Sequence, residues 1–241
     1  MNQELMNPEF TIILSLGQLV NSKDSNSIDI FSKTLAEQIE GPEKVVGLLT
    51  KLYSSAVFTI DKAVHFISDK GVIDRLNTGK MEQDLFVEYL RKWCLGTIIE
   101  EEKLISLWNE FCTPSNDAIN NIGSLLQVLE ENKHIKVIIA SVTNDLNYRH
   151  ILNNIVEKFG ERWYELVEVG QIIPSFSYLC GTTNYDTLAT TALKNDTTIK
   201  VSIHRNITQF GECHPYNLQQ NKEIGPFIMN LIAAIGSNRN I

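Results

Sequence analysis

Three short runs of β-branched and apolar residues, widely spaced along the chain, constrain the fold more than any other feature. They occupy residues 10–14 (FTIIL), 135–140 (IKVIIA) and 198–203 (TIKVSI). Runs of this length and composition are typical of buried strands, and long stretches with helical periodicity separate them. Strands that alternate with helices favour a parallel sheet, because parallel neighbours need a crossover connection. We therefore expect an α/β fold: a three-layer, Rossmann-like core with a mainly parallel sheet.

The helical stretches divide the chain into two expected units. Beyond the three strands, apolar residues recur at helical spacing near residues 119–129, 150–159, 187–193 and 225–235, and two shorter runs, 167–169 and 172–173, are candidates for short strands. Before residue 113 the pattern is helical throughout, with apolar stripes at 85–93 and 104–111. We expect a core built from residues 8–21 and 113–241, and an all-helical cap formed by residues 22–112 and inserted after the first strand.

Composition argues against several classes of function. The chain has 21 Lys and Arg against 29 Asp and Glu, a net charge of −8 that repels nucleic-acid phosphates and anionic lipid. No apolar run approaches the roughly 20 residues that a membrane span needs. The polar start of the chain carries no pattern of a secretory signal. The four cysteines form no CxxC pair, so reduced thiols in a cytoplasmic protein are expected.

The sheet also predicts where a site would lie. In an open parallel sheet, ligands bind beside the carboxyl ends of the strands. That rule selects Ser15 and Gly17 after the first run, residues 141–144 after the second, the loop near Gly181, and His204 after the third. None of these segments carries a GxGxxG or P-loop glycine pattern, which argues against dinucleotide and Walker-type nucleotide binding.

With strands, helical insert and loops in this order, the chain resembles the haloacid dehalogenase-like (HAD) hydrolase superfamily, in the branch with a helical cap after the first strand. Residues 14–20 (LSLGQLV) are similar to the family pattern F-D-L-G-N-V-L, and residues 141–145 (SVTND) to S-N-T-N. Residues 181–186 (GTTNYD) fall where the family has G-x-x-K-P-D, and 202–206 (SIHRN) where it has a pair of aspartates. The stretch 79–111 looks like the family's cap helices.

The resemblance implies a known chemistry and shows which groups this chain lacks. In the family, an aspartate on the first strand attacks the substrate, and in phosphatases Mg²⁺ sits among that aspartate and the acid pair. A lysine offsets negative charge, and a hydroxyl from the second motif binds the transferring group. By resemblance, the nucleophile position is Ser15, the lysine position is Asn184, and His204 stands near the acid pair. The hydroxyl is kept at Ser141.

We expect these positions to form a vestigial pocket with no catalytic residue, no metal and no cofactor. Its expected members are Ser15, Gly17, Ser141, Thr143, Asn144, Asn184, Asp186 and His204. Asp186 is expected to serve as a structural acid. A hydroxyl cannot replace a carboxylate in a magnesium site, and loss of the nucleophile alone typically costs a factor of roughly 10⁴ to 10⁶ in rate.

The sequence therefore favours a pseudophosphatase that acts through protein–protein contacts, as an adaptor, an assembly subunit or a scaffold. Two alternatives stay open: a phosphate-ester hydrolase with a reorganised site that uses Ser15 with His204 or Asp186, and a small-ligand sensor that uses the cap–core cleft. The pair His204–Arg205 is also a candidate anion site. A bacterial cytoplasm is the expected location, with a secreted effector or a secretion-machine component as the alternative.

Several further features have both a structural and a functional interpretation. The acidic run at 100–102 suits the start of a helix, or an acidic face for a basic partner. The three tryptophans, Trp93, Trp108 and Trp163, are typical core residues, and any that is exposed is a candidate anchor for a partner. The pair Cys213–His214 is weak as a metal signal, and a plain loop is the expected structure there.

Overall fold

The computed structural model describes residues 9–20, 70–93, 101–110, 113–193, 198–210, 213–217, 221 and 223–238. Within these residues, four strands form one sheet: β1 (Phe10–Leu14), β2 (Ile135–Ser141), β3 (Ile172–Phe176) and β4 (Ile199–Ser202), in the order β3-β2-β1-β4. Every neighbouring pair is parallel, and Phe10 is in register with both Ile135 and Ile199. The expected α/β fold with a parallel sheet is therefore confirmed.

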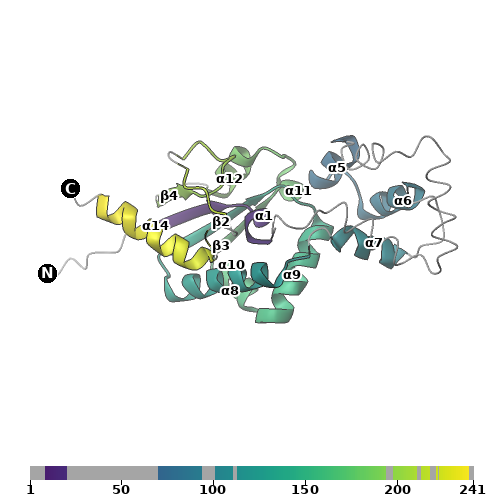
Figure 1. Ribbon diagram of the computed structural model, residues 1–241. Coiled ribbons are helices and arrows are strands. Elements are labelled where there is room, and N and C mark those ends of the chain that lie inside the picture. Colours follow the sequence, from purple (N-terminus) through teal and green to yellow (C-terminus); the bar gives the residue numbers. More distant parts are fainter. Residues whose placement is uncertain are drawn as a thin grey trace.

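Helices cover both faces of this sheet (Figure 1). One face carries α8 (Asn116–Glu131), α9 (Asp145–Phe159), α10 (Arg162–Glu168) and α14 (Ile224–Asn238). The other carries α12 (Tyr185–Leu193). Side chains of β1 alternate between the two layers, because Ile12 and Leu14 pack in the first cluster and Ile13 in the second. This alternation places the central strand in the middle of a three-layer core.

Two short helices follow strands directly. One residue, Ser15, separates β1 from α1 (Leu16–Val20), and α11 (Ser177–Cys180) begins immediately after β3. Both lie at the carboxyl ends of the strands, where the expected site residues are found.

In the part of the chain that the structure describes, three further helices come between β1 and β2 in the sequence: α5 (Lys70–Asn77), α6 (Gln83–Trp93) and α7 (Glu101–Glu110). They lie together at one end of the molecule, beyond α11 (Figure 1). Their own apolar cluster joins Val72, Leu76, Met81 and Phe86, and the core contributes Leu146 to it. These helices agree with an inserted helical cap. Residues 22–69, 94–100 and 111–112 of the expected cap lie outside the described residues, so its bounds of 22–112 stay a prediction.

The cap helices are attached to the core beside the carboxyl ends of β2 and β3. The Asn144 side-chain amide donates a hydrogen bond of 3.1 Å to Asn77 Oδ1 at the end of α5. Gly79 has a φ of 67° and lies against the backbone carbonyl of Tyr178, so that any larger residue would collide there. A polar contact, a close backbone approach and the Leu146 side chain together hold this junction.

The expected short strand at residues 167–169 is wrong. Val167 and Glu168 end α10, and Val169 is the residue that follows it. Trp163 and Leu166, three positions apart, are the buried residues of this helix, so the period is helical and not that of a strand. The candidate strand at 172–173 is confirmed as the start of β3.

The described tryptophans belong to the interior. Trp163 is fully buried, and Trp108 is half-buried with its ring 4.8 Å from that of Phe86 in an edge-on contact. The side chain of Trp93 lies outside the described residues. Of the acidic run, Glu101 and Glu102 open α7 and are exposed. Among the described residues, no helix is long and apolar enough to cross a membrane.

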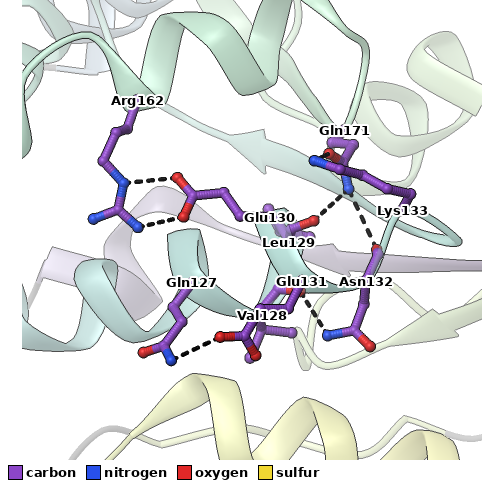
Figure 2. A network of polar contacts seen from close by, with 9 residues as sticks. All are labelled: Gln127, Val128, Leu129, Glu130, Glu131, Asn132, Lys133, Arg162 and Gln171. Atoms are coloured by element: carbon purple, nitrogen blue, oxygen red, sulfur yellow. Dashed lines mark hydrogen bonds and ion pairs between the residues drawn. The ribbon is translucent and has the colours of Figure 1, made fainter.

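A polar network fixes the connections at the amino ends of β2 and β3 (Figure 2). Buried Gln171 donates from its side-chain amide to the Leu129 carbonyl at 2.7 Å, and Lys133 donates to its Oε1 at 3.2 Å. Beside it, Arg162 forms a two-pronged pair with Glu130 at 2.7 and 2.6 Å, and this hydrogen bonding lowers the pKa of the Glu130 carboxyl. The network is therefore a structural anchor at the edge opposite the expected site.

The C-terminal helix α14 packs closely on α8. Asn121 is buried, and its Oδ1 accepts hydrogen bonds from the Tyr216 hydroxyl at 2.9 Å and the Ile224 amide at 2.6 Å. Burial raises the pKa of Tyr216 to about 12, which keeps this phenol a donor. One residue further on, the Gly225 amide donates to Ser124 Oγ at 3.1 Å.

Replacement of Gly225 by alanine is expected to loosen this packing. The added Cβ would lie 2.8 Å from the Ser124 carbonyl oxygen and 2.9 Å from Val128 Cγ2, so the unfolding free energy should fall by about 1–3 kcal/mol. Gly236→Ala, on the same helix with nothing within 4 Å, is the matched control and should gain up to about 1 kcal/mol. Urea unfolding measures both, and an equal effect of the two substitutions would contradict the close α8–α14 contact.

Candidate functional site

Ser15, at the expected nucleophile position, caps the first helix. It directly follows β1, is 4% exposed, and precedes α1. The Ser15 amide donates to Gln18 Oε1 at 3.0 Å, and the Gln18 amide donates back to the Ser15 carbonyl at 3.1 Å. A side chain at the third helical position that reaches back to the first capping amide is one half of a capping box. The local geometry at Ser15 is therefore that of a helix start.

Gln18 also joins the carboxyl ends of two strands. Its Nε2 donates to the Ile203 carbonyl, just after β4, at 2.7 Å, and to the Tyr216 carbonyl at 3.2 Å. The segment that carries Tyr216 pairs with the end of β4, since the His214 amide donates to the Ser202 carbonyl at 3.0 Å. One neutral amide thus satisfies three backbone groups between β1, β4 and this segment. We did not expect a role for Gln18 from the sequence, although the S-x-x-Q pattern of a capping box is present at residues 15–18.

The loop after β2 is committed to internal contacts. Asn144 caps α9 by accepting from the Asn147 amide at 3.0 Å, and its side-chain NH₂ contacts Asn77 of the cap. The Thr143 amide donates to Ser177 Oγ at 3.0 Å, and that hydroxyl donates to the Thr143 carbonyl at 2.8 Å. Ser141 is buried at the end of β2. Ser177, which we did not expect from the sequence, therefore fixes this loop to α11.

Asn184, at the expected lysine position, is exposed and caps α12. Its Oδ1 accepts from the Thr187 amide at 2.9 Å. Asp186, two residues on, accepts from the Thr208 amide at 2.9 Å through its carboxylate, and its carbonyl accepts from Gln209 Nε2 at 2.6 Å. These contacts tie α12 to the segment that follows β4.

His204 is half-buried and stacks on an aromatic ring. Its imidazole lies 4.4 Å from the Tyr185 ring, with 27° between the planes. The Asn206 amide donates to its Nδ1 at 3.3 Å, which places the proton of the neutral ring on Nε2. Burial lowers the pKa of His204 and raises that of Tyr185. The neighbouring Arg205 is exposed. The site thus holds a neutral imidazole that is both stacked and hydrogen-bonded.

The residues present do not fit Mg²⁺. Magnesium requires oxygen ligands in near-octahedral geometry and is usually held by carboxylates. Within the described part of the chain, no group of three or more His, Cys, Asp and Glu side chains could hold a metal ion. The hydroxyls of Ser15 and Ser202 lie at the ends of β1 and β4, and the Ile203 and Tyr216 carbonyls beside them already accept from Gln18. The Asp186 carboxylate accepts from Thr208 instead.

Comparison with known proteins gives a fold and no closer relationship. No family model matches the chain, and no curated protein matches it. Among solved structures, a HAD family enzyme from Bacteroides thetaiotaomicron superimposes with a TM-score of 0.52 at 15% identity, over 81% of this chain and 82% of that chain. A second structure, of the wild-type enzyme in complex with magnesium and inorganic phosphate, gives 0.50 at 16% identity, over 80% and 83%. The chain therefore has a HAD-like fold, as expected.

Truncation of Gln18 is expected to open the edge of the sheet. Gln18→Ala removes three hydrogen bonds and leaves the Ser15 amide and the Tyr216 carbonyl without this partner, while the Ile203 carbonyl still accepts from the Tyr216 amide, so the change should cost about 1–3 kcal/mol of unfolding free energy. Gln127→Ala is the matched control, because Gln127 is exposed and bonds only along its own helix to Glu131, and it should cost less than about 0.5 kcal/mol. If urea unfolding gives the same loss of unfolding free energy for both variants, the Gln18 side chain does not hold this edge of the sheet together.

His204 predicts a pH dependence of stability. Because its pKa is lowered in the folded state, the unfolded chain protonates first as the pH falls below the ordinary value of 6.5, and the unfolding free energy decreases until the folded pKa is passed. His204→Phe keeps a ring against Tyr185 and removes the titration, so its stability should vary less over this window. His204→Gln should flatten the profile equally but be less stable throughout. Unchanged pH profiles in both variants would be inconsistent with a buried neutral imidazole.

Proposed function

We propose that this protein is a catalytically inactive member of the HAD-like fold, a pseudophosphatase that acts through protein–protein contacts as an adaptor, an assembly subunit or a scaffold. The observation that carries the proposal is the Gln18 amide, which joins the carboxyl ends of β1 and β4 through the Ile203 and Tyr216 carbonyls. Both carbonyl oxygens already accept from Gln18, and within the described residues no group of three or more His, Cys, Asp and Glu side chains could hold a cation.

Nucleophilic attack by Ser15 is also poorly supported. A serine needs a neighbouring base with a free lone pair, oriented by a third group. The Nδ1 lone pair of His204 accepts from Asn206, and the ring proton on Nε2 makes that nitrogen a donor. The Asp186 carboxylate accepts from the Thr208 amide, and in the described residues it forms no hydrogen bond with the imidazole. The Ser15–His204 pair therefore lacks the parts of a catalytic triad.

At the position where the resemblance implies a lysine, the chain has the neutral residue Asn184, which caps a helix. Asn184 is exposed and engaged at the start of α12. With asparagine there and serine at residue 15, neither of these two positions carries a charge that could oppose that of a phosphate or stabilise a transition state. Electrostatic stabilisation of this kind is usually the largest single contribution to catalysis.

The rest of the fold is intact, which favours a role that depends on shape. The sheet has a continuous buried core, and the cap helices are fixed to it by the Asn77–Asn144 hydrogen bond and by Leu146. A rigid surface of this kind suits a protein-binding platform, because little conformational entropy is lost on binding. On the composition of the chain alone, we propose that the protein works in a bacterial cytoplasm or is a secreted bacterial effector.

A phosphatase assay tests the proposal directly. The full-length protein, incubated with Mg²⁺ and a generic phosphomonoester such as p-nitrophenyl phosphate, is expected to release phosphate no faster than a reaction without protein. Ser15→Ala provides the matched variant, since it removes only the hydroxyl at the nucleophile position. Turnover by the wild type that disappears in Ser15→Ala would overturn the proposal and establish the reorganised hydrolase in its place.

A further inference from the structure

Helix α10 exposes a face on which two apolar side chains lie among carboxylates. Tyr164 is 45% exposed, and Val169, just after the helix, is 67% exposed. They are two of the five large apolar side chains that the described part of the chain exposes. The exposed carboxylates of the same segment are those of Glu161, Glu165 and Glu168. Positions three or four apart share one side of a helix, so these residues form one surface, which we call the α10 face.

The buried side of α10 holds this face in place. Trp163 is fully buried and Leu166 is 3% exposed, and both belong to the main core. Arg162 reaches across to Glu130 of α8 in the two-pronged pair of Figure 2. Gly170, with a φ of 74°, adopts the left-handed conformation that turns the chain into β3. The α10 face is therefore fixed before a partner binds, which lowers the entropy cost of binding.

The carboxylates of the α10 face are not matched by cations. Arg162, the basic residue of the helix, is engaged by Glu130. Elsewhere in the described part of the chain a surface carboxylate does have a cation, since Asp145 pairs with Arg149 at 2.8 Å. Among the described residues no ion pair joins any of the three carboxylates of the face, and the exposed Lys158 at the end of α9 forms none with them. The face thus offers negative charge that a partner can neutralise.

We infer that the α10 face binds a basic, amphipathic segment of another protein, one that sets lysine or arginine beside apolar side chains. This inference rests on the proposed function in protein–protein contacts and names the surface and the partner's chemistry. The carboxylates of the face accept charge-assisted hydrogen bonds from such cations. The Tyr164 ring attracts a cation over its face, and Val169 gives apolar side chains a contact that excludes water. The net charge of −8 steers a basic partner toward the protein.

Charge separates this occupant from the others. A second copy on the same face would set three carboxylates against three, and like charges across a contact are costly. Nucleic acid and anionic lipid carry the same sign of charge as the face and are repelled by it. An uncharged partner would desolvate the carboxylates without pairing them. A basic segment with an apolar side matches both kinds of side chain on the α10 face.

Fluorescence anisotropy with two labelled synthetic peptides tests the inference on the full-length protein. The first peptide is the amphipathic KLLRKLLKRLLK, and the second, KQQRKQQKRQQK, has the same charge with glutamine in place of leucine. The wild type is expected to bind the first peptide with a dissociation constant of roughly 10–100 µM. It is expected to bind the second at least about threefold more weakly, because glutamine offers no apolar contact to Tyr164 and Val169.

Substitutions then locate the site. Glu165→Gln combined with Glu168→Gln removes two carboxylates at constant size and should weaken binding of the first peptide about fivefold or more. Asp74→Asn combined with Asp117→Asn, at exposed positions of α5 and α8, removes the same charge elsewhere and should change binding by less than about twofold. Val169→Ser should weaken binding of the leucine peptide about threefold and leave that of the glutamine peptide unchanged.

Three results would overturn the inference: no binding of the leucine peptide by the wild type, equal affinities for the two peptides, or an equal loss in the two double variants. All substituted side chains are exposed, and circular dichroism checks that each variant keeps the wild-type spectrum. The outcome is separable from that of the phosphatase assay, because α10 contributes no residue to the Ser15–His204 edge. An inert protein that binds neither peptide would contradict only this partner, and a protein that binds the leucine peptide and releases phosphate would contradict only the proposed inactivity.

Discussion

The hydrogen bonds of the Gln18 side chain are the contact on which the rest of this site depends. Parallel strands that end together leave backbone carbonyls and amides at one edge, and buried groups of this kind must find partners. Here a single neutral amide satisfies the Ser15 amide and the carbonyls of Ile203 and Tyr216. Because this network is complete without charge, it gives a cation little to bind. Other side chains along this edge are also neutral and engaged within the protein: Asn144 and Asn184 cap helices, and the His204 ring is neutral and stacked.

The fold supports this neutral edge from both sides. β1 is buried and has a strand on each side in the sheet, and Ser15 and Gln18 follow directly after it, so their backbone is held by the centre of the core. The cap helices meet the core at the same edge, through Asn77 and the close approach of Gly79 to Tyr178. The side chains of Gln18, Asn144 and Asn184 therefore hold loops and helices together. That is the physical basis for our proposal of a role in binding.

Much of the architecture could be predicted from the sequence, because the three β-branched runs are strongly apolar and clearly bounded. The error at 167–169 arose because a short apolar run does not distinguish a strand from the last turn of a helix. The site was harder to predict. The S-x-x-Q pattern at residues 15–18 was available as a local signal, whereas the contacts from Gln18 to Ile203 and Tyr216 span most of the chain and have no local signature. The Tyr185–His204 stack and the Asn77–Asn144 pair likewise depend on the tertiary fold alone.

A crystal structure of the protein grown in magnesium and inorganic phosphate would test the central claim most directly. Our account predicts that the Gln18 amide still donates to the carbonyls of Ile203 and Tyr216, with no cation between β1 and β4. A magnesium ion coordinated there by Ser15 or by either carbonyl, with Gln18 turned away, would contradict it.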